Sequence, residues 1–81
     1  MDNSWLADYL ENNLVKDVLK SNSLRRTGDT FLSHWLGRLR GSEKLASHEW
    51  NNLANLISMS GQIIGKNYYP ALSYCKERGA V

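Results

Sequence analysis

The sequence predicts an all-α protein, a single small domain of four to five short helices over residues 1–81. Apolar residues recur at helical spacing in several segments, and helix-capping residues, Gly or Pro stand between them. The composition is 42% hydrophobic with one Pro, which is typical of a globular chain rather than a disordered one. A chain of this length buries a limited core, so binding a partner or forming a homodimer would add stability.

The first helix is expected from Trp5 to about Lys20, after the capping residues Asp2, Asn3 and Ser4. Its buried stripe is Leu6, Ala7, Leu10, Leu14 and Val18. Trp5 and Tyr9 lie off one edge of that stripe, and Val15 and Leu19 lie off the other. A helix with this much apolar surface either packs between two neighbouring helices or leaves an apolar strip exposed for another chain. The four residues at the edges of the stripe are therefore candidates for partner binding. The alternative is a break near Asn13 that reorients the two apolar sets.

A second helix is expected over residues 27–41, capped by Thr27 or Asp29 and ended by Gly41 in the left-handed conformation. Arg25 and Arg26 would lie in the connection before it or on a short turn. Its predicted core stripe is Phe31, Leu32, Trp35, Leu36 and Leu39.

The outward face of this second helix carries small residues, and a mid-helix glycine costs roughly 1 kcal/mol relative to alanine. The candidate partner-binding residues there are Thr30, Ser33, His34 and Gly37. A partner helix or a phosphate backbone that approaches closely would explain the smooth surface. A tolerated surface glycine would explain it as well.

A third helix is expected to start at Ser42 or Ser47, and its buried stripe is Trp50, Leu53, Ala54, Leu56 and Ile57. Asn51, Asn52 and Asn55 lie on its opposite face. Gly61 is expected to break or bend the chain. The last helix is expected over residues 70–78, from Pro70 to a stop at Gly79.

Residues 49–69 resemble, loosely, the helix-turn-helix pattern of DNA-binding proteins. Ala54 lies in the first helix of the pattern, Met59 to Gly61 form its turn, and Ile63 or Ile64 is buried in its second helix. The resemblance implies that Gln62, Lys66 and Asn67 face the major groove.

The net charge is only +2, but basic residues concentrate around the second helix. Arg25, Arg26, Arg38, Arg40 and Lys44 are therefore candidates for phosphate contacts. A solvated, functionless face is the alternative.

Other chemistry finds little support in the sequence. Cys75 has no second cysteine to pair with, and His34, His48 and Cys75 lack the spacing of zinc ligands. No phosphate loop or dinucleotide fingerprint is present, so we expect no enzyme, no metal and no cofactor. The start lacks a secretory signal and no run of eighteen apolar residues occurs, so we expect a cytoplasmic protein without a membrane partner.

Together these patterns predict a small non-enzymatic regulator that docks on a protein partner, with auxiliary phosphate contacts, in transcription or another DNA-linked process. One alternative is an autonomous helix-turn-helix-like DNA-binding protein. A second is a protein inhibitor or adaptor with no role in nucleic-acid binding.

Overall fold

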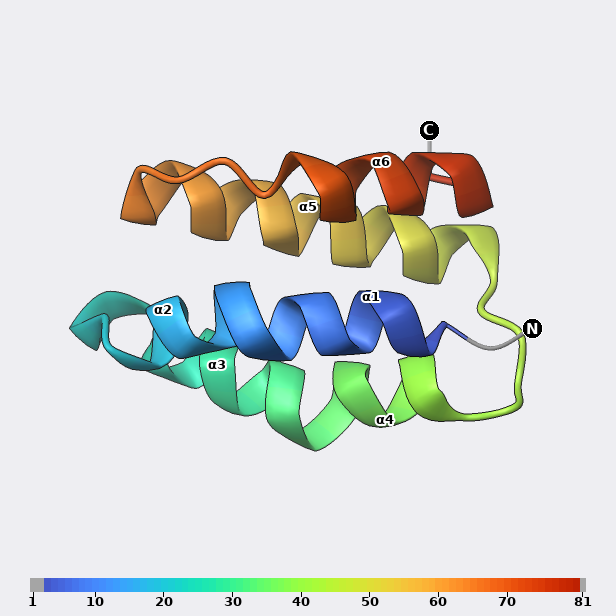
Figure 1. Cartoon of the computed structure of the whole chain (residues 1–81), viewed down its shortest axis with the longest axis horizontal. Coiled ribbons are helices and arrows are strands. Elements are labelled where there is room, and N and C mark those ends of the chain that lie inside the picture. Colours follow the sequence, from blue (N-terminus) through green and yellow to red (C-terminus); the bar gives the residue numbers. More distant parts are fainter. Residues whose placement is uncertain (1–2, 81) are drawn as a thin grey trace. The chain divides into compact units, whose positions relative to one another are not determined.

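The computed structural model describes residues 3–80, and these form four helices without a strand (Figure 1). The all-α prediction is therefore confirmed for this part of the chain. Two compact units, Met1–Glu43 and Lys44–Val81, divide the protein, and each is described here by itself. The expectation of one domain stays a prediction.

The first helix of unit 1 runs without a break through α1 (Ser4–Tyr9), the π-helical segment η1 (Leu10–Val15) and α2 (Lys16–Leu19). The alternative of a break near Asn13 is wrong, because the chain there adopts π-helical geometry instead. Wider turns leave carbonyl groups without their usual helical donors, and the Asn13 Nδ2 group donates to the Tyr9 carbonyl oxygen at 2.8 Å.

The π segment changes which residues share the buried face. A π turn holds about 4.4 residues, so each residue advances roughly 80° instead of 100°. Across η1 this shift carries Val15 onto the side of Ala7, and Val15 is only 2% exposed. The prediction that Val15 lies off the edge of the stripe is wrong, whereas Leu6, Ala7, Leu10, Leu14 and Val18 are buried as expected.

The second helix of unit 1 starts earlier than the sequence predicts. It comprises η2 (Asn22–Leu24, a 3₁₀ turn), α3 (Arg25–Thr30), the π segment η3 (Phe31–Trp35) and α4 (Leu36–Arg40). Arg25 and Arg26 therefore lie in the first turn of α3 rather than in a connection, and Thr27 and Asp29 do not cap the helix. Gly41 ends the helix as predicted, but in extended geometry (φ −76°, ψ 169°) rather than left-handed geometry.

The second π segment also corrects the predicted core stripe. Phe31, Trp35, Leu36 and Leu39 are buried, but Leu32 is 48% exposed. In a regular α-helix Leu32 would lie between Leu36 and Leu39. The smaller rotation per residue through η3 moves it to the edge of the stripe.

The two helices of unit 1 form an antiparallel hairpin in which α1 packs on α4 and α2 packs on α3 (Figure 1). The helices approach closely at Gly28, where an added Cβ would lie 2.6 Å from Leu19 Cδ2 and 3.1 Å from Val18 Cγ2. At the other end, the Asn3 amide donates to the Leu39 carbonyl oxygen at 3.2 Å. The absence of a side chain at Gly28 and the backbone hydrogen bond from Asn3 to Leu39 therefore set how the two helices of the hairpin pack.

Unit 2 is a second antiparallel helix pair, α5 (Ser47–Ile64) and α6 (Tyr69–Arg78). The Glu49 carboxylate accepts from the Ala46 amide at 2.9 Å and so supports the start of α5 at Ser47, one of the two predicted starts. Pro70 lies in the first turn of α6, and Gly79 ends that helix at φ +142°, so the last helix agrees with its prediction.

The predicted break at Gly61 is wrong, because α5 continues to Ile64 and ends at Gly65 in the left-handed region (φ +81°). The amides of Gly65 and Lys66 both donate to the Gly61 carbonyl oxygen, at 2.8 and 3.0 Å. A Cβ at position 61 would lie 2.8 Å from the Lys66 carbonyl oxygen. Glycine is needed at position 61 for this close return of the chain, and no turn occurs there.

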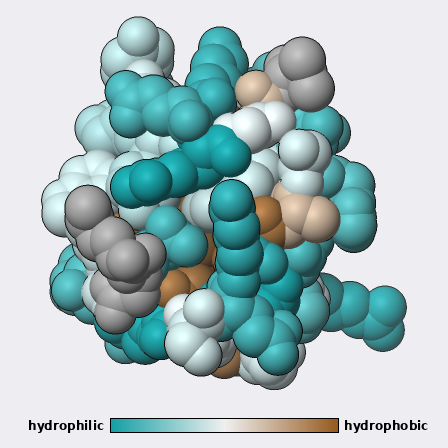
Figure 2. All heavy atoms as spheres, turned by 90° about the vertical axis from the view of Figure 1, so that its right-hand side faces the viewer, coloured by the Kyte–Doolittle hydropathy of each residue, from teal (hydrophilic) through white to brown (hydrophobic). Residues whose placement is uncertain are grey.

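The core of unit 2 combines apolar side chains with one satisfied hydroxyl. Trp50, Leu53, Ile57, Tyr68, Ala71 and Cys75 are buried, and the Ser60 hydroxyl donates to the Leu56 carbonyl oxygen at 2.8 Å. Burial raises the pKa of the Cys75 thiol to about 12, so this cysteine is a protonated packing residue at neutral pH. The molecular face drawn in Figure 2 is largely hydrophilic, with hydrophobic residues showing only in small areas.

Candidate protein-docking site

A shallow depression of about 510 Å³ lies on the outer face of the second helix and the segment that follows it. Its lining, which we call the small-residue depression, is Ser33, His34, Gly37, Arg38, Gly41, Ser42 and Glu43. Three residues that the sequence predicts for partner binding, Ser33, His34 and Gly37, therefore meet in one place. Thr30 is exposed one turn earlier, outside the lining, and its hydroxyl donates to the Arg26 carbonyl oxygen at 3.0 Å.

The floor of the depression follows from side-chain size. Ser33, Gly37 and Gly41 recur every four residues, so they form a nearly straight row along the helix with little side-chain volume. A Cβ added at Gly37 would meet nothing within 4 Å. No atom of the described chain explains this glycine by packing.

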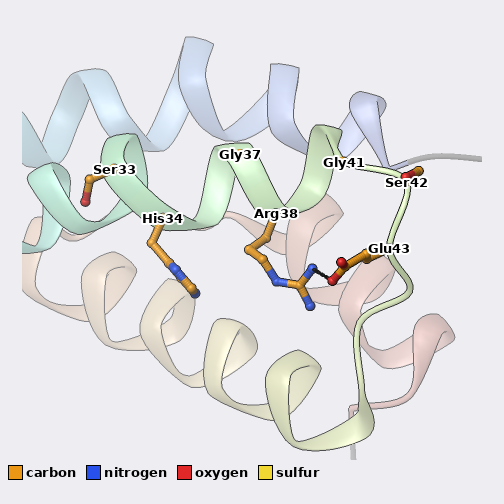
Figure 3. Close-up of a pocket in the computed structure, with 7 residues that line it drawn as sticks. All are labelled: Ser33, His34, Gly37, Arg38, Gly41, Ser42 and Glu43. Carbon is orange, nitrogen blue, oxygen red and sulfur yellow. Dashed lines mark hydrogen bonds and ion pairs between the residues drawn. The ribbon is translucent and has the colours of Figure 1, made fainter.

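The rim of the depression carries polar and charged groups. His34 and Arg38, one turn apart, project from the same side of the helix in Figure 3, and Arg38 Nη1 lies 3.5 Å from Glu43 Oε2. Glu43 is largely exposed, so solvent weakens this long ion pair. The Glu43 carboxylate can therefore be repositioned by an approaching charged group at little cost.

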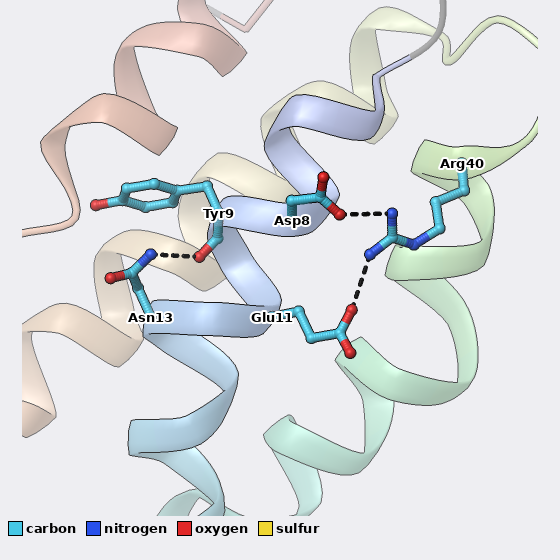
Figure 4. A network of polar contacts seen from close by, with 5 residues as sticks. All are labelled: Asp8, Tyr9, Glu11, Asn13 and Arg40. Atoms are coloured by element: carbon cyan, nitrogen blue, oxygen red, sulfur yellow. Dashed lines mark hydrogen bonds and ion pairs between the residues drawn. The ribbon is translucent and has the colours of Figure 1, made fainter.

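Arg40, which the sequence assigns to phosphate contacts, is engaged within unit 1. Its two terminal nitrogens lie 2.8 Å from Asp8 Oδ1 and 2.8 Å from Glu11 Oε1, so it bridges two acids of the first helix (Figure 4). The hydrogen bonds to Asp8 and Glu11 raise the pKa of Arg40 above its ordinary value. The concentration of positive charge seen in the sequence is thus reduced by acids that come from another helix.

Arg25 and Arg26 are placed differently from the other two arginines of unit 1. Both are exposed in the first turn of α3, and neither guanidinium group forms an ion pair or hydrogen bond with any residue from 3 to 80. Lys44, the fifth predicted cation, is exposed in the segment before α5. The structure therefore separates the predicted cationic patch into paired and unpaired members.

Gln62, Lys66 and Asn67 are brought together, but without the predicted motif. They line a depression of about 420 Å³ where α5 meets the segment before α6, next to Gly61, Gly65 and Tyr68. Gln62 lies in the last turn of α5, whereas Lys66 and Asn67 follow the helix end. Because α5 runs straight through residues 59–61, no recognition helix begins there, and the helix-turn-helix interpretation is wrong.

The apolar partner-binding candidates on the first helix divide between surface and core. The Trp5 and Tyr9 rings stack with their centroids 5.6 Å apart, and Trp5 is 53% exposed. Leu19 is also partly exposed, near Gly28, while Val15 is buried. The structure does not place Val15 with the other candidates.

Sequence reasoning missed three members of the small-residue depression, namely Gly41, Ser42 and Glu43. The four-residue spacing of Ser33, Gly37 and Gly41 is a signal that could have found the first of them. Ser42 and Glu43 follow the helix end, and a helical pattern does not place residues beyond it.

Comparisons with protein families, with curated proteins and with solved structures find no match for this chain. Among residues 3–80, no three His, Cys, Asp or Glu side chains lie together in a way that could hold a metal ion. Within the same residues, every helix is too short or too polar to cross a membrane.

Proposed function

We propose that the protein is a small non-enzymatic regulator that binds a protein partner in the small-residue depression. The observation that carries this proposal is the empty space around Gly37, which has no atom within 4 Å of an added Cβ. A mid-helix glycine destabilises the helix by roughly 1 kcal/mol relative to alanine. No packing contact within the described chain offsets this loss at Gly37. A close external contact is a reason to keep it.

The occupant that fits this surface best is a helix of the partner protein. Helices pack by placing the side-chain ridges of one into the grooves of the other. Rows of residues four apart normally form ridges, so a row of small residues leaves a groove instead. Ser33, Gly37 and Gly41 form one of these rows, and their small size lets the partner backbone approach. At the rim, Arg38 and Glu43 offer one charge of each sign, which can set the register of the bound helix.

The role in transcription or another DNA-linked process belongs to the same proposal. Its support is the pair of unpaired cations at Arg25 and Arg26, which lies apart from the depression on the same helix. A protein inhibitor or adaptor without a nucleic-acid role would use the depression alone.

Site-specific photo-crosslinking tests the docking. A photoreactive residue at Ser33, in the depression, is compared with one at Asn12, an exposed residue of the first helix in the same unit. In cells that produce the protein, we expect position 33 to give a discrete protein adduct that position 12 does not give. Identical adducts from both positions would contradict the proposal.

The captured partner is then purified and titrated against the wild type and Gly37→Leu. We expect Gly37→Leu to weaken binding at least about tenfold, because its side chain fills the groove. Circular dichroism checks that the helices of this variant are intact. Unchanged affinity in a folded Gly37→Leu protein would place the contact elsewhere.

A further inference from the structure

The turn that joins the two helices of unit 1 carries a cluster of cations without acidic partners. We call Lys20, Arg25 and Arg26 the hairpin-turn cations. All three are exposed, and none of their side chains forms an ion pair or hydrogen bond with a residue in the described range 3–80. This turn is at the end of the hairpin away from the start of α1 (Figure 1).

A short hydrogen-bonded turn separates Lys20 from the two arginines. The amides of Lys20 and Ser21 donate back to Asp17 and Val18, and the Leu24 amide donates to the Ser21 carbonyl oxygen. These bonds, at 3.1–3.2 Å, fold the five residues between Lys20 and Arg26 into a tight corner. Charge therefore gathers over a short stretch of backbone instead of spreading along a helix.

The position of the two arginines is unfavourable for the isolated protein. The first turn of a helix is the positive end of its dipole, where a cation is disfavoured by roughly 0.3–1 kcal/mol. Other arginines of the same unit are neutralised, since Arg40 contacts two acids and Arg38 lies near Glu43. The cost at Arg25 and Arg26 would be relieved by an external anion.

We propose that the hairpin-turn cations bind the phosphate backbone of nucleic acid. Arg presents a planar fork of donors that matches a phosphate group. The residues between the cations, Ser21, Asn22 and Ser23, are hydroxyl and amide donors of the kind that contact phosphate oxygens.

The surroundings argue against an acidic protein as the ligand. A protein interface needs a desolvated apolar centre, but residues 20–23 are polar and Leu24 is buried, so among residues 19–24 only Leu19 exposes an apolar side chain. Phosphate contacts need only charge and hydrogen bonds, and they require no such centre. This phosphate binding rests on the DNA-linked part of the proposed function. Its surface is distinct from the small-residue depression, so protein docking there and phosphate binding at the turn can fail independently.

The test measures binding of a short, random-sequence DNA duplex by fluorescence anisotropy from about 50 to about 200 mM salt. With three phosphate contacts, wild-type affinity should fall about 40-fold over that range, whereas Arg25→Gln/Arg26→Gln should fall only about threefold. At the low-salt end the double variant should bind more weakly than the wild type. Its thermal stability should be unchanged or higher, because the unfavourable charges have been removed.

The matched control is Lys76→Gln/Arg78→Gln, which removes the same charge from two exposed residues of unit 2. We expect its salt dependence to follow the wild type. No duplex binding at 50 mM salt, or an equal loss in the control and in the arginine variant, would overturn the proposal. Equal affinity for polyglutamate or for anionic lipid vesicles at the same salt would also overturn it.

Discussion

The two units are both antiparallel helix pairs, but different features fix their geometry. In unit 1 each helix contains a π segment, and the charges are dense, with six acidic and six basic residues in 1–43. In unit 2 the helices are regular and the charges sparse, with two acidic and four basic residues in 44–81. The turn between the two helices of unit 2 depends on Gly61 and Gly65.

This difference shows that a helical hairpin can be set in two ways. Unit 1 adjusts which residues face the partner helix by widening a turn, and it adds an ion-pair network between α1, η1 and α4. Unit 2 keeps the α-helical register. Its chain turns back so closely after α5 that the Lys66 backbone packs against Gly61. The predictions below test these two explanations in order of expected effect.

The largest effect should come from the register that η3 sets. Phe31→Ala should lower the free energy of unfolding by about 3–5 kcal/mol because Phe31 is fully buried. Leu32→Ala should change it by about 0.5 kcal/mol or less, since Leu32 lies at the edge of the stripe. Urea unfolding followed by circular dichroism measures both. Equal losses would show that the helix keeps α-helical register in solution.

The next effect concerns close approach at glycine in the two units. Gly61→Ala should cost about 1–3 kcal/mol, because the new Cβ meets a backbone oxygen that cannot move alone. Gly28→Ala should cost less, since its Cβ meets the end of the partly exposed Leu19 side chain. The same urea series gives the comparison, and a larger loss at Gly28 would contradict it.

A third substitution should stabilise the protein. Gly37→Ala adds a Cβ in open space and should raise the free energy of unfolding by roughly 1 kcal/mol, the helix-propensity difference. Thermal unfolding of this variant beside wild type measures the change. A loss of stability instead would mean that an internal contact uses the space at Gly37, which would remove the main support for partner docking.

The smallest effect should come from the exposed ion pairs of Arg40. Asp8→Asn and Arg40→Gln should each lower stability slightly, and the double variant should lose less than the two single losses together. Both losses should disappear at about 1 M salt, because exposed charges are then screened. Glu77→Gln in unit 2 is the control and should show no such salt dependence. Additive, salt-independent losses would show that packing, not charge, is responsible.

Residue patterns predicted much of the fold. Helix class, the ends at Gly41 and Gly79, and the start of α6 beside Pro70 follow from local preferences of glycine and proline. Most core residues follow from helical spacing. Val15 and Leu32 do not, because a turn widened by one residue shifts the stripe, and single-sequence periodicity assumes a constant rotation.

The candidate site was predicted less completely. Ser33, His34 and Gly37 were identified from their shared face, but the segment that closes the depression follows the helix end, where periodicity gives no position. The arginines were identified as a group, although acids distant in sequence neutralise Arg40. Charge counted along a segment cannot show which acids another helix brings near.

The sequence by itself determined that this chain forms helices and which residue types lie on each face, because propensity and amphipathic spacing are local properties. Tertiary structure decided where the helices widen, which glycines lie against another segment and which cations keep their charge unpaired. Those features depend on atoms that are distant in sequence and meet only when helices pack. For this reason Gly61 is explained by the chain around it, and Gly37 is not.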